Sequence, residues 1–334
     1  MPLVSVIIPA YNAEKTILET IQSIQVQTLS DLEIIVINDG STDETVALVE
    51  AIADPRIRII SYENGGLPTA RNRGIRNATG EFLSFIDADD LWTPDKLELQ
   101  VEALRQNSEA GVAYSWTAFI DEKSQFLYAW EPLFYAGNIY PDLLIRNFIS
   151  NGSNILVRRS TVERVGEFDP TLKSVEDWEY YLRLAAISPF VLVPHYQILY
   201  RRSTQAMTSN VEVMEQANLT VIERAFQVAP PELQHLKSQS LANAYRYLAK
   251  QHFFNGMNQK KISDLTHRTS LKKANKKFLK AIQLDPKILF HRETQRLLIK
   301  LITVQLLPEK LANSLIQWVQ KNLPMVAMQW GVRS

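Results

Sequence analysis

The N-terminal half of the chain alternates short apolar runs with segments of helical periodicity. Residues 4–8, 33–38 and 82–86 are β-branched or aromatic and are each followed by turn residues, and residues 56–60 and 112–116 are weaker examples. Continuous apolar runs of this length are typical of strands covered on both faces, as in a parallel sheet. Segments with the three- and four-residue apolar spacing of a helix lie between them, at residues 17–28, 41–49, 69–77 and 94–105. This order predicts an α/β fold with a doubly wound, mostly parallel sheet.

Two of these helices carry recognisable start signals. Ser41 and Glu44 have the spacing of a capping box, in which each side chain satisfies a main-chain N–H of the first turn. Thr93 is followed by Pro94, a combination typical of an N-cap and the first helical position. We therefore expect helices to begin directly after Ser41 and Thr93.

Polar residues and glycines gather where the predicted strands end. In an open α/β sheet, ligands bind in the crevice outside the carboxyl ends of the strands. Taken singly, Asp39 suits an Asx-turn, and Gly65 and Gly66 suit a loop that needs positive φ. Their common place at one edge favours a binding crevice instead. The residues concerned are Pro9, Ala10, Tyr11 and Asn12 after the first strand, Asp39 after the second, Gly65, Gly66 and Arg71 after the third, and Asp87, Ala88, Asp89 and Asp90 after the fourth.

The most distinctive of these turns holds three carboxylates within four residues, at Asp87, Asp89 and Asp90. Two like charges about 4 Å apart repel by roughly 4 kcal/mol at an effective dielectric constant of about 20. Such a cluster indicates a counter-ion, and a hard divalent cation that also binds a diphosphate is the simplest one. An acidic turn that only precedes the next helix is the alternative interpretation.

Bulk composition narrows the class of protein. The chain of 334 residues, 46% apolar, suits one large domain or two smaller ones. Lys and Arg number 36, equal to Asp and Glu, so no overall field favours nucleic acid, and we expect no nucleic-acid partner. Cysteine is absent, which excludes disulfides and thiolate metal sites. The first residues lack the basic region of a signal peptide and no apolar run is long enough to span a bilayer, so a cytoplasmic location is expected.

Five ordered motifs resemble those of the GT-A nucleotide-sugar glycosyltransferases of the large inverting family 2. The spacing agrees over roughly residues 1–205, which the resemblance makes the catalytic domain, with a nucleotide-sugar half at about 1–110 and an acceptor half at about 111–205. The matching segments are residues 4–12 (VSVIIPAYN), 33–43 (EIIVINDGSTD), 70–74 (ARNRG), 87–90 (DADD) and 175–178 (VEDW).

The resemblance implies a role for each residue of the donor site. Asp39 would accept a hydrogen bond from the nucleobase, most commonly uracil, and Arg71 would approach the diphosphate. Asp87 would contact the ribose or the water shell of the metal, and Asp89 would coordinate Mn²⁺ or Mg²⁺, the expected cofactor. The remaining predicted donor-site residues are Pro9, Ala10, Tyr11, Asn12, Gly66 and Ala88.

On the acceptor side, the resemblance makes Asp177 the catalytic base that takes the proton of the attacking hydroxyl. Glu176 is the competing carboxylate. Residues 174–177 also match a capping box, so Asp177 could simply start the helix predicted at 178–187. A single base without a positioned carboxylate nucleophile favours inversion by one displacement. Asn154 and Trp178 complete the predicted acceptor side, although a plain turn is an equal interpretation of the loop that holds Asn154.

The chain departs from the family pattern in two places. It lacks the Gln-x-x-Arg-Trp signature and the membrane spans of processive synthases, which favours a non-processive transferase. It also has Tyr200, Arg201, Arg202 and Ser203 where many relatives carry Arg-x-His. The predicted reaction is therefore the transfer of a hexosyl or hexosaminyl group from a nucleotide-sugar to a carbohydrate, lipid-linked or protein hydroxyl, in cell-surface polysaccharide or glycolipid assembly.

The C-terminal region, residues 206–334, has helical periodicity throughout. Tyr245, Leu248, Ala249, His252 and Gly256 match the first helix of a tetratricopeptide-like pair, and Ala274, Phe278, Ala281 and Pro286 match the second. A basic run includes Lys260, Lys261, Arg268, Lys272, Lys273, Lys276, Lys277 and Lys280, with Asp264 as its only acid. This run and the amphipathic segments near Trp318 and Trp330 leave two interpretations open: a packed helical appendage, or peripheral contact with the inner face of a membrane.

Other classes fit less well. A sugar-nucleotide pyrophosphorylase or a dinucleotide dehydrogenase would carry a Gly-rich phosphate loop after the first strand, where this chain has Pro9 to Asn12. A non-catalytic scaffold that acts through its helical tail is the remaining alternative, and the intact acidic residues disfavour it.

Overall fold

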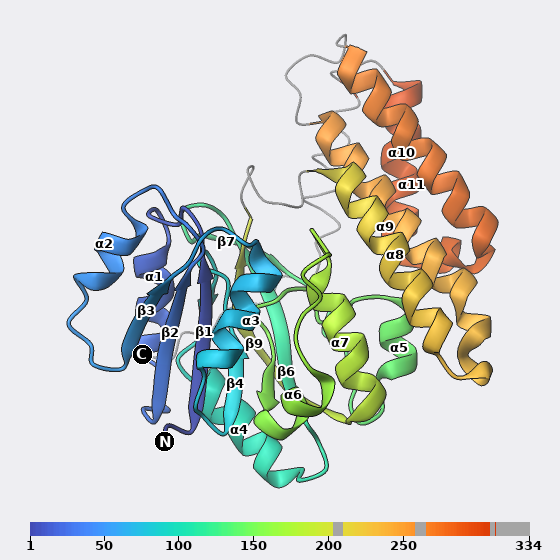
Figure 1. Ribbon diagram of the computed structural model, residues 1–334. Helices are drawn as coiled ribbons and strands as arrows, with labels where there is room; N and C mark the ends of the chain where they lie inside the picture. The colour runs from blue at the N-terminus through green and yellow to red at the C-terminus, as the bar shows by residue number, and fades with distance from the viewer. Residues whose placement is uncertain (203–209, 258–264, 308–310, 312–334) are drawn as a thin grey trace. The chain divides into compact units, whose positions relative to one another are not determined.

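The computed structural model describes residues 1–202, 210–257, 265–307 and 311 of the chain. These residues form two compact units (Figure 1). One contains residues 1–143 and 147–202, and the other contains residues 144–146 and 210–307. The predicted mostly parallel α/β sheet followed by a helical region is confirmed.

The first unit is built on one sheet with the strand order β3-β2-β1-β4-β8-β6-β9-β5, and β7 pairs with β6. Strands β3, β2, β1 and β4 pair in parallel, and so do β6 and β9, whereas β8, β5 and β7 run antiparallel to their neighbours. The strands are β1 (Val4–Ala10), β2 (Leu32–Asn38), β3 (Ile57–Ser61), β4 (Phe82–Phe85), β5 (Leu91–Trp92), β6 (Val112–Ile120), β7 (Phe126–Ala129), β8 (Leu156–Arg158) and β9 (Phe190–Arg201).

Helices cover both faces of this sheet (Figure 1). Val4, Val6 and Ile8 of β1 share a buried cluster with apolar side chains of α1 (Ile17–Gln25) and α4 (Lys96–Gln106). Ile7 points to the opposite face, where its side chain contacts Gly74 of α3 (Leu67–Asn77) so closely that a Cβ there would lie 2.2 Å from Ile7 Cγ2. The other helices of this part are α2 (Thr45–Glu50), α5 (Tyr140–Ile145), α6 (Arg159–Val165) and α7 (Glu176–Ile187).

The helical unit contains the predicted helix pair. The antiparallel helices α9 (Lys237–Met257) and α10 (Leu265–Leu284) pack together, since Gly256 lies beside Leu271 while Ala242 clusters with Ala281. None of the helices in the described ranges is long and apolar enough to cross a membrane. The remaining elements are α8 (Val211–Val228), α11 (Arg292–Leu306) and the 3₁₀ helices η2 (Pro231–Leu236) and η3 (Pro286–Phe290). Predictions about Lys260, Lys261, Asp264, Trp318 and Trp330 concern positions outside the described residues.

The predicted helix starts were wrong by two or three residues. Helix α2 begins at Thr45 rather than after Ser41, because Asp43 accepts hydrogen bonds from the N–H and hydroxyl of Thr45 and so serves the first turn. Helix α4 begins at Lys96 rather than after Thr93, with Asp95 at the N-cap position. The side chain of Asp95 makes no capping hydrogen bond and instead accepts one from the hydroxyl of Thr93.

Candidate functional site

The carboxyl ends of β1, β2 and β4 lie side by side at one edge of the sheet because the three strands are parallel neighbours. The turns that follow them remain in register: the N–H of Asp39 donates to Ala10 O over 2.8 Å, and that of Ile86 donates to Ile7 O over 3.1 Å. The structure therefore places the turns after three separate strands along one edge, and Tyr11, Asn12, Asp39, Asp87 and Asp89 stand in these turns, whereas Pro9 and Ala10 end β1 and Gly66 and Arg71 belong to the start of α3 and to α3 itself.

Within the first turn, the four predicted residues have different environments. Pro9 and Ala10 are the buried last residues of β1, whereas Tyr11 is 55% exposed. Asn12 adopts a positive φ of 49°, and its side-chain oxygen accepts a hydrogen bond from the N–H of Thr42. Asn12 thus fastens this turn to the loop after β2, which leaves Tyr11 as the side chain of this turn that is open to a ligand.

The carboxylate of Asp39 organises the loop before α3. It accepts hydrogen bonds from the N–H groups of Gly65 at 2.9 Å and Gly66 at 2.8 Å, and from Arg73 Nη1 at 2.6 Å. The side chain is only 4% exposed. A nucleobase that reached Asp39 would have to share these acceptor oxygens. Arg73 was not among the predicted site residues, and no local pattern in the sequence indicated its ion pair with Asp39.

Gly66 stands at the N-cap of α3 with φ of 84°. A Cβ at this position would meet no atom within 4 Å, so the backbone conformation, rather than lack of space, requires glycine here.

The acidic turn after β4 divides into one inward and two outward carboxylates. Asp90 is fully buried, where its carboxylate accepts hydrogen bonds from the hydroxyl of Ser153 and from the N–H of Arg201. Burial, and then the charges of Asp89 and Asp87, raise the pKa of Asp90 well above its ordinary value. Asp90 is thus enclosed within the fold, and Asp87 and Asp89 are the carboxylates of this turn that remain partly exposed.

Asp87 and Asp89 remain partly exposed at the edge of the sheet. Burial, and then repulsion from Asp87, raise the pKa of Asp89 to about 6. Burial is the larger cause, and the negative charge of Asp87 adds to it. Ala88 between them is 9% exposed. Oxygen ligands of this kind suit Mg²⁺ or Mn²⁺.

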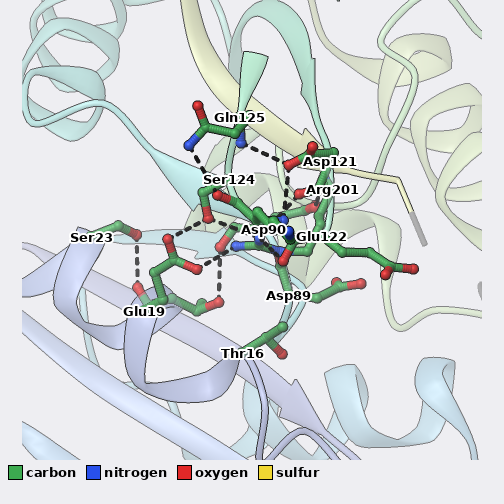
Figure 2. Close-up of polar contacts among 12 residues, drawn as sticks. Thr16, Glu19, Ser23, Asp89, Asp90, Asp121, Glu122, Ser124, Gln125 and Arg201 are labelled. Carbon is green, nitrogen blue, oxygen red and sulfur yellow. Dashed lines mark hydrogen bonds and ion pairs between the residues drawn. The ribbon is translucent and has the colours of Figure 1, made fainter. Parts of the chain in front are cut away.

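Arg201, the last residue of β9, is hydrogen-bonded to this acidic turn (Figure 2). Its Nε donates to the main-chain oxygen of Asp89 over 2.6 Å, and its own N–H donates to Asp90 Oδ1 over 2.9 Å. Another guanidinium nitrogen, Nη2, forms an ion pair of 2.7 Å with Glu19 of α1, and Nη1 donates to the hydroxyl of Ser124. The side chain is 3% exposed. Arg201 therefore ties the turn to α1 and to the β6–β7 connection, a role that its sequence position did not reveal.

Arg71 of α3 lies buried between two carboxylates that are distant in sequence. Its Nη2 donates to Asp87 over 2.7 Å and its Nη1 donates to Glu176 over 2.6 Å, while its side chain is 1% exposed. Burial opposes the charge of Arg71, but Asp87, Glu176 and Asp177 outweigh this effect and raise the pKa of the guanidinium. A Cβ at Gly152 would lie 2.1 Å from Nη2, so the loop before β8 closes directly over Arg71. The expected approach of Arg71 to a diphosphate therefore has little room in this conformation.

Glu176 and Asp177 open helix α7, and their side chains have different partners. The carboxylate of Glu176 is 6% exposed and bound to Arg71. Asp177 Oδ1 accepts from the N–H of Trp178, and its Oδ2 has only a long contact of 3.4 Å with Asn147 Nδ2. Burial, and then the charge of Glu176, raise the pKa of Asp177 to about 7, against the opposing effect of Arg71.

The capping box expected at residues 174–177 does not form. Val175 takes the N-cap position with φ of 55°, and no side chain accepts a capping hydrogen bond there. The alternative interpretation of Asp177 as a capping-box residue therefore loses its support. Asn147, which contacts Asp177, was not among the predicted site residues.

Two residues expected on the acceptor side lie in the interior. Asn154 is fully buried, its Nδ2 donates to Ser115 O and Ile149 O, and its Oδ1 accepts from the N–H of Ser115. Trp178 is 3% exposed and its Nε1 donates to Leu143 O over 2.9 Å. An acceptor contact by either side chain has no support in this geometry, because both are enclosed and hydrogen-bonded within the fold.

Comparison with known proteins identifies the family. Residues 5–252 match the profile of the glycosyltransferase-like family 2. An uncharacterized glycosyltransferase of Rickettsia typhi is 34% identical over 214 residues, which cover 63% of this chain and 66% of that relative. The chain thus spans about two thirds of the relative's length.

Solved structures support the fold. TarS from S. aureus (residues 1–349), in complex with UDP-GlcNAc, aligns with 96% of this chain and 92% of its own, with a TM-score of 0.58 and 19% identity. The mannosyltransferase PcManGT from Pyrobaculum calidifontis, in complex with GDP-Man and Mn²⁺, aligns with 96% of this chain and 87% of its own, with a TM-score of 0.59 and 21% identity. At these identities the similarity shows a shared fold, the GT-A-like arrangement of nucleotide-sugar transferases.

Proposed function

The chain belongs to the glycosyltransferase-like family 2, and we propose that it transfers a sugar from a nucleoside diphosphate donor, most commonly UDP, to a hydroxyl acceptor with inversion at the anomeric carbon. The observation that carries this proposal is the ion-pair network around Arg71. It joins Asp87, from the turn after β4, to Glu176, the neighbour of the candidate base Asp177. One buried guanidinium thus connects the turn proposed to bind donor with the helix start proposed to hold the base, which supports the close positioning that a transfer reaction requires.

Asp177 is the base in this proposal. The acceptor oxygen attacks the anomeric carbon, the bond from that carbon to the diphosphate oxygen breaks, and the hydroxyl proton passes to Asp177. Support comes from its weak hydrogen bonding at Oδ2 and from its pKa of about 7, which suits a base that works near neutral pH. Glu176 is less suited, because Arg71 already holds its carboxylate.

A divalent cation fits the outward carboxylates of Asp87 and Asp89. No group of three or more carboxylate or imidazole side chains in the described part of the chain could hold a metal. The proposed site therefore relies on Asp89 and Asp87 together with the diphosphate oxygens of the donor, a combination typical of Mg²⁺. When bound, Mn²⁺ or Mg²⁺ would neutralise the charge of the leaving diphosphate.

The donor pocket is proposed along the same edge of the sheet. Tyr11 offers an exposed ring to the base and ribose, with Pro9 and Ala10 behind it, and Gly66 leaves its side open to the ligand. Asp39 holds the loop of Gly65 and Gly66 and would reach the nucleobase only by sharing its acceptor oxygens. The same solved structures, with UDP-GlcNAc or GDP-Man bound, give the first donors to test.

For the acceptor, we propose a carbohydrate, lipid-linked or protein hydroxyl, and a role in cell-surface polysaccharide or glycolipid assembly. A single, non-processive addition is supported by the absence of a Gln-x-x-Arg-Trp signature. Whether the sugar is a hexose or a hexosamine is part of the same test.

The proposal is tested by incubating the chain with UDP-GlcNAc, UDP-glucose and GDP-mannose, with Mn²⁺ or with a chelator, and measuring release of the nucleoside diphosphate. We expect release from at least one donor, its loss with the chelator, and its loss in Asp177→Asn with donor binding retained. If no donor binds in the presence of Mn²⁺, the proposal fails; if the helical tail captures a partner at the same time, the chain is a non-catalytic scaffold that acts through that tail.

A further inference from the structure

Helix α10 carries a row of cations along its exposed side, which winds by about 120° around the helix from its first to its last member. Arg268, Lys272, Lys276 and Lys280 follow one another at intervals of four residues, and all four side chains are exposed. With a rise of about 1.5 Å per residue, successive charges stand roughly 6 Å apart along the helix. We call these four residues the α10 stripe.

The other two lysines of α10 have a different place. Lys273 forms an ion pair of 2.6 Å with Glu212, and Lys277 forms one with Glu215, so both contribute to the packing of α8 against α10. The α10 stripe has no such partner among the residues that the structure describes. The helix itself contains no acidic residue that could neutralise it.

Like charges four residues apart destabilise a helix. The α10 stripe therefore works against the stability of α10, whereas Lys273 and Lys277 support the packing of the helix. A partner that carries negative charges along a line or a plane would remove this repulsion.

An exposed apolar side chain and a surface hollow lie beside the cations of the α10 stripe. Leu279, between Lys276 and Lys280, is 66% exposed. Beside it lies a hollow of about 410 Å³ whose lining combines the polar and apolar groups of Tyr245, Lys276, Lys277, Leu279, Lys280 and Gln283. The lysine ammonium groups around this hollow match the negative charge of a lipid headgroup, and the exposed Leu279 matches the acyl chain attached to it.

We propose that the α10 stripe docks the helical unit on a membrane surface rich in anionic phospholipids, with the phosphates on the four cations and Leu279 inserted among the headgroups. A row of cations can meet a plane of phosphates at every position, and the charge attraction acts within the Debye length of the surface. The bilayer explains both features of the stripe, because a soluble polyanion has use for the cations but none for Leu279.

The inference does not depend on the proposed transferase activity, since its test measures binding alone. The full chain is sedimented with vesicles of phosphatidylcholine and with vesicles that also contain phosphatidylglycerol. We expect binding to the anionic vesicles only, and its loss at about 1 M salt, where the Debye length falls to about 3 Å. Each cation removed from the stripe should weaken partitioning roughly fivefold.

The decisive variant is Lys272→Gln/Lys276→Gln/Lys280→Gln. Its matched control, Arg105→Gln/Lys173→Gln/Lys287→Gln, removes the same charge at exposed positions outside α10. We expect the control to bind as the parent chain does and the stripe variant to lose binding. Equal binding by the two variants would overturn the proposal.

Leu279→Gln distinguishes a membrane from a soluble polyanion. It should weaken binding to anionic vesicles and leave binding to polyphosphate unchanged. A chain that bound polyphosphate but no vesicles would show that the stripe serves another partner.

Discussion

Arg71 and Glu176 are 105 residues apart in the chain, yet their side chains form a buried hydrogen-bonded ion pair of 2.6 Å. Through this pair, the helix that follows β3 supports the first turn of α7, where Asp177 stands. Because Arg71 also binds Asp87, the position of the candidate base and that of the acidic turn depend on the same guanidinium.

Arg71→Met should destabilise the fold by about 3–5 kcal/mol, because it leaves the buried carboxylate of Glu176 without its counter-charge. Glu176→Gln should be milder, since an amide oxygen can still accept from Arg71. The free energy of unfolding in urea measures both effects. Arg105→Met, at an exposed position of α4, is the control and should stay within about 0.5 kcal/mol of the parent chain.

Gly152→Ala tests the same guanidinium without removing it. The new methyl group would lie 2.1 Å from Arg71 Nη2, so Arg71 must shift away from Asp87. We expect nucleotide release to fall together with stability, the latter by about 1–3 kcal/mol. Arg71→Lys and Gly152→Ala should be less than additive when combined, because both disturb one contact. Full additivity would argue against a shared cause.

Asp177 makes turnover depend on pH. A base must be deprotonated to act, so turnover should rise with pH through about 7 and decline as the pH falls below this value. A pH–rate profile with saturating donor measures this rise in turnover. If the profile is flat between pH 5 and about 8, Asp177 does not titrate as the base.

The same residue has the opposite effect on stability. A carboxyl whose pKa is raised in the folded state is protonated in the fold while it is already ionised in the unfolded chain, so stability contributed at this site declines as the pH rises from about 4 to about 7 and stays low above that. Asp177→Asn should therefore unfold at a higher temperature than the parent chain above pH 7, by a free-energy difference on the order of a few kcal/mol. A lower melting temperature at this pH would contradict the shift.

Asp89 should make metal binding sensitive to acid. A carboxylate must lose its proton to bind a cation, so the affinity for Mn²⁺ in the presence of donor should fall as the pH drops through about 6. Asp89→Ala should abolish Mn²⁺-dependent donor binding, which a thermal-shift titration detects. The exposed Asp31→Asn is the matched control and should bind as the parent chain does.

Arg201→Lys should weaken Mn²⁺-dependent donor binding although residue 201 has no predicted contact with donor. A lysine cannot replace the separate hydrogen bonds to Asp89, Ser124 and Glu19, and leaving one buried group unsatisfied costs about 1–3 kcal/mol. The neighbouring Arg202→Lys is the control, since Arg202 is exposed and donates to Tyr128. Equal donor affinities in the two variants would show that Arg201 does not position the acidic turn.

Local patterns in the sequence were sufficient for β1, β2, β3, β4 and β6 and for the parallel order of the first four, whereas β5, β7 and β9 were not predicted. Runs such as residues 33–38 carry the β-branched side chains that a doubly covered strand requires, and parallel pairing then places Asp39 and Asp87 along the same edge without further information. The helix starts were less predictable, because Asp43 rather than Ser41 accepts from the N–H of Thr45, and Thr93 donates its hydroxyl to Asp95 instead of capping α4.

Burial and pairing were decided only by the tertiary structure. Nothing in the sequence distinguishes Asp90, which is fully buried and has a raised pKa, from the partly exposed Asp89 beside it. Asn154 forms hydrogen bonds with the main chain of Ser115 inside the sheet, and Arg71 lies between Asp87 and Glu176. Both arrangements arise because segments far apart in the chain enclose these side chains. Periodicity and turn chemistry act over a few residues and therefore determine elements and their ends. The solvation and charge of a side chain depend on whatever packs around it, which is known only once the chain has folded.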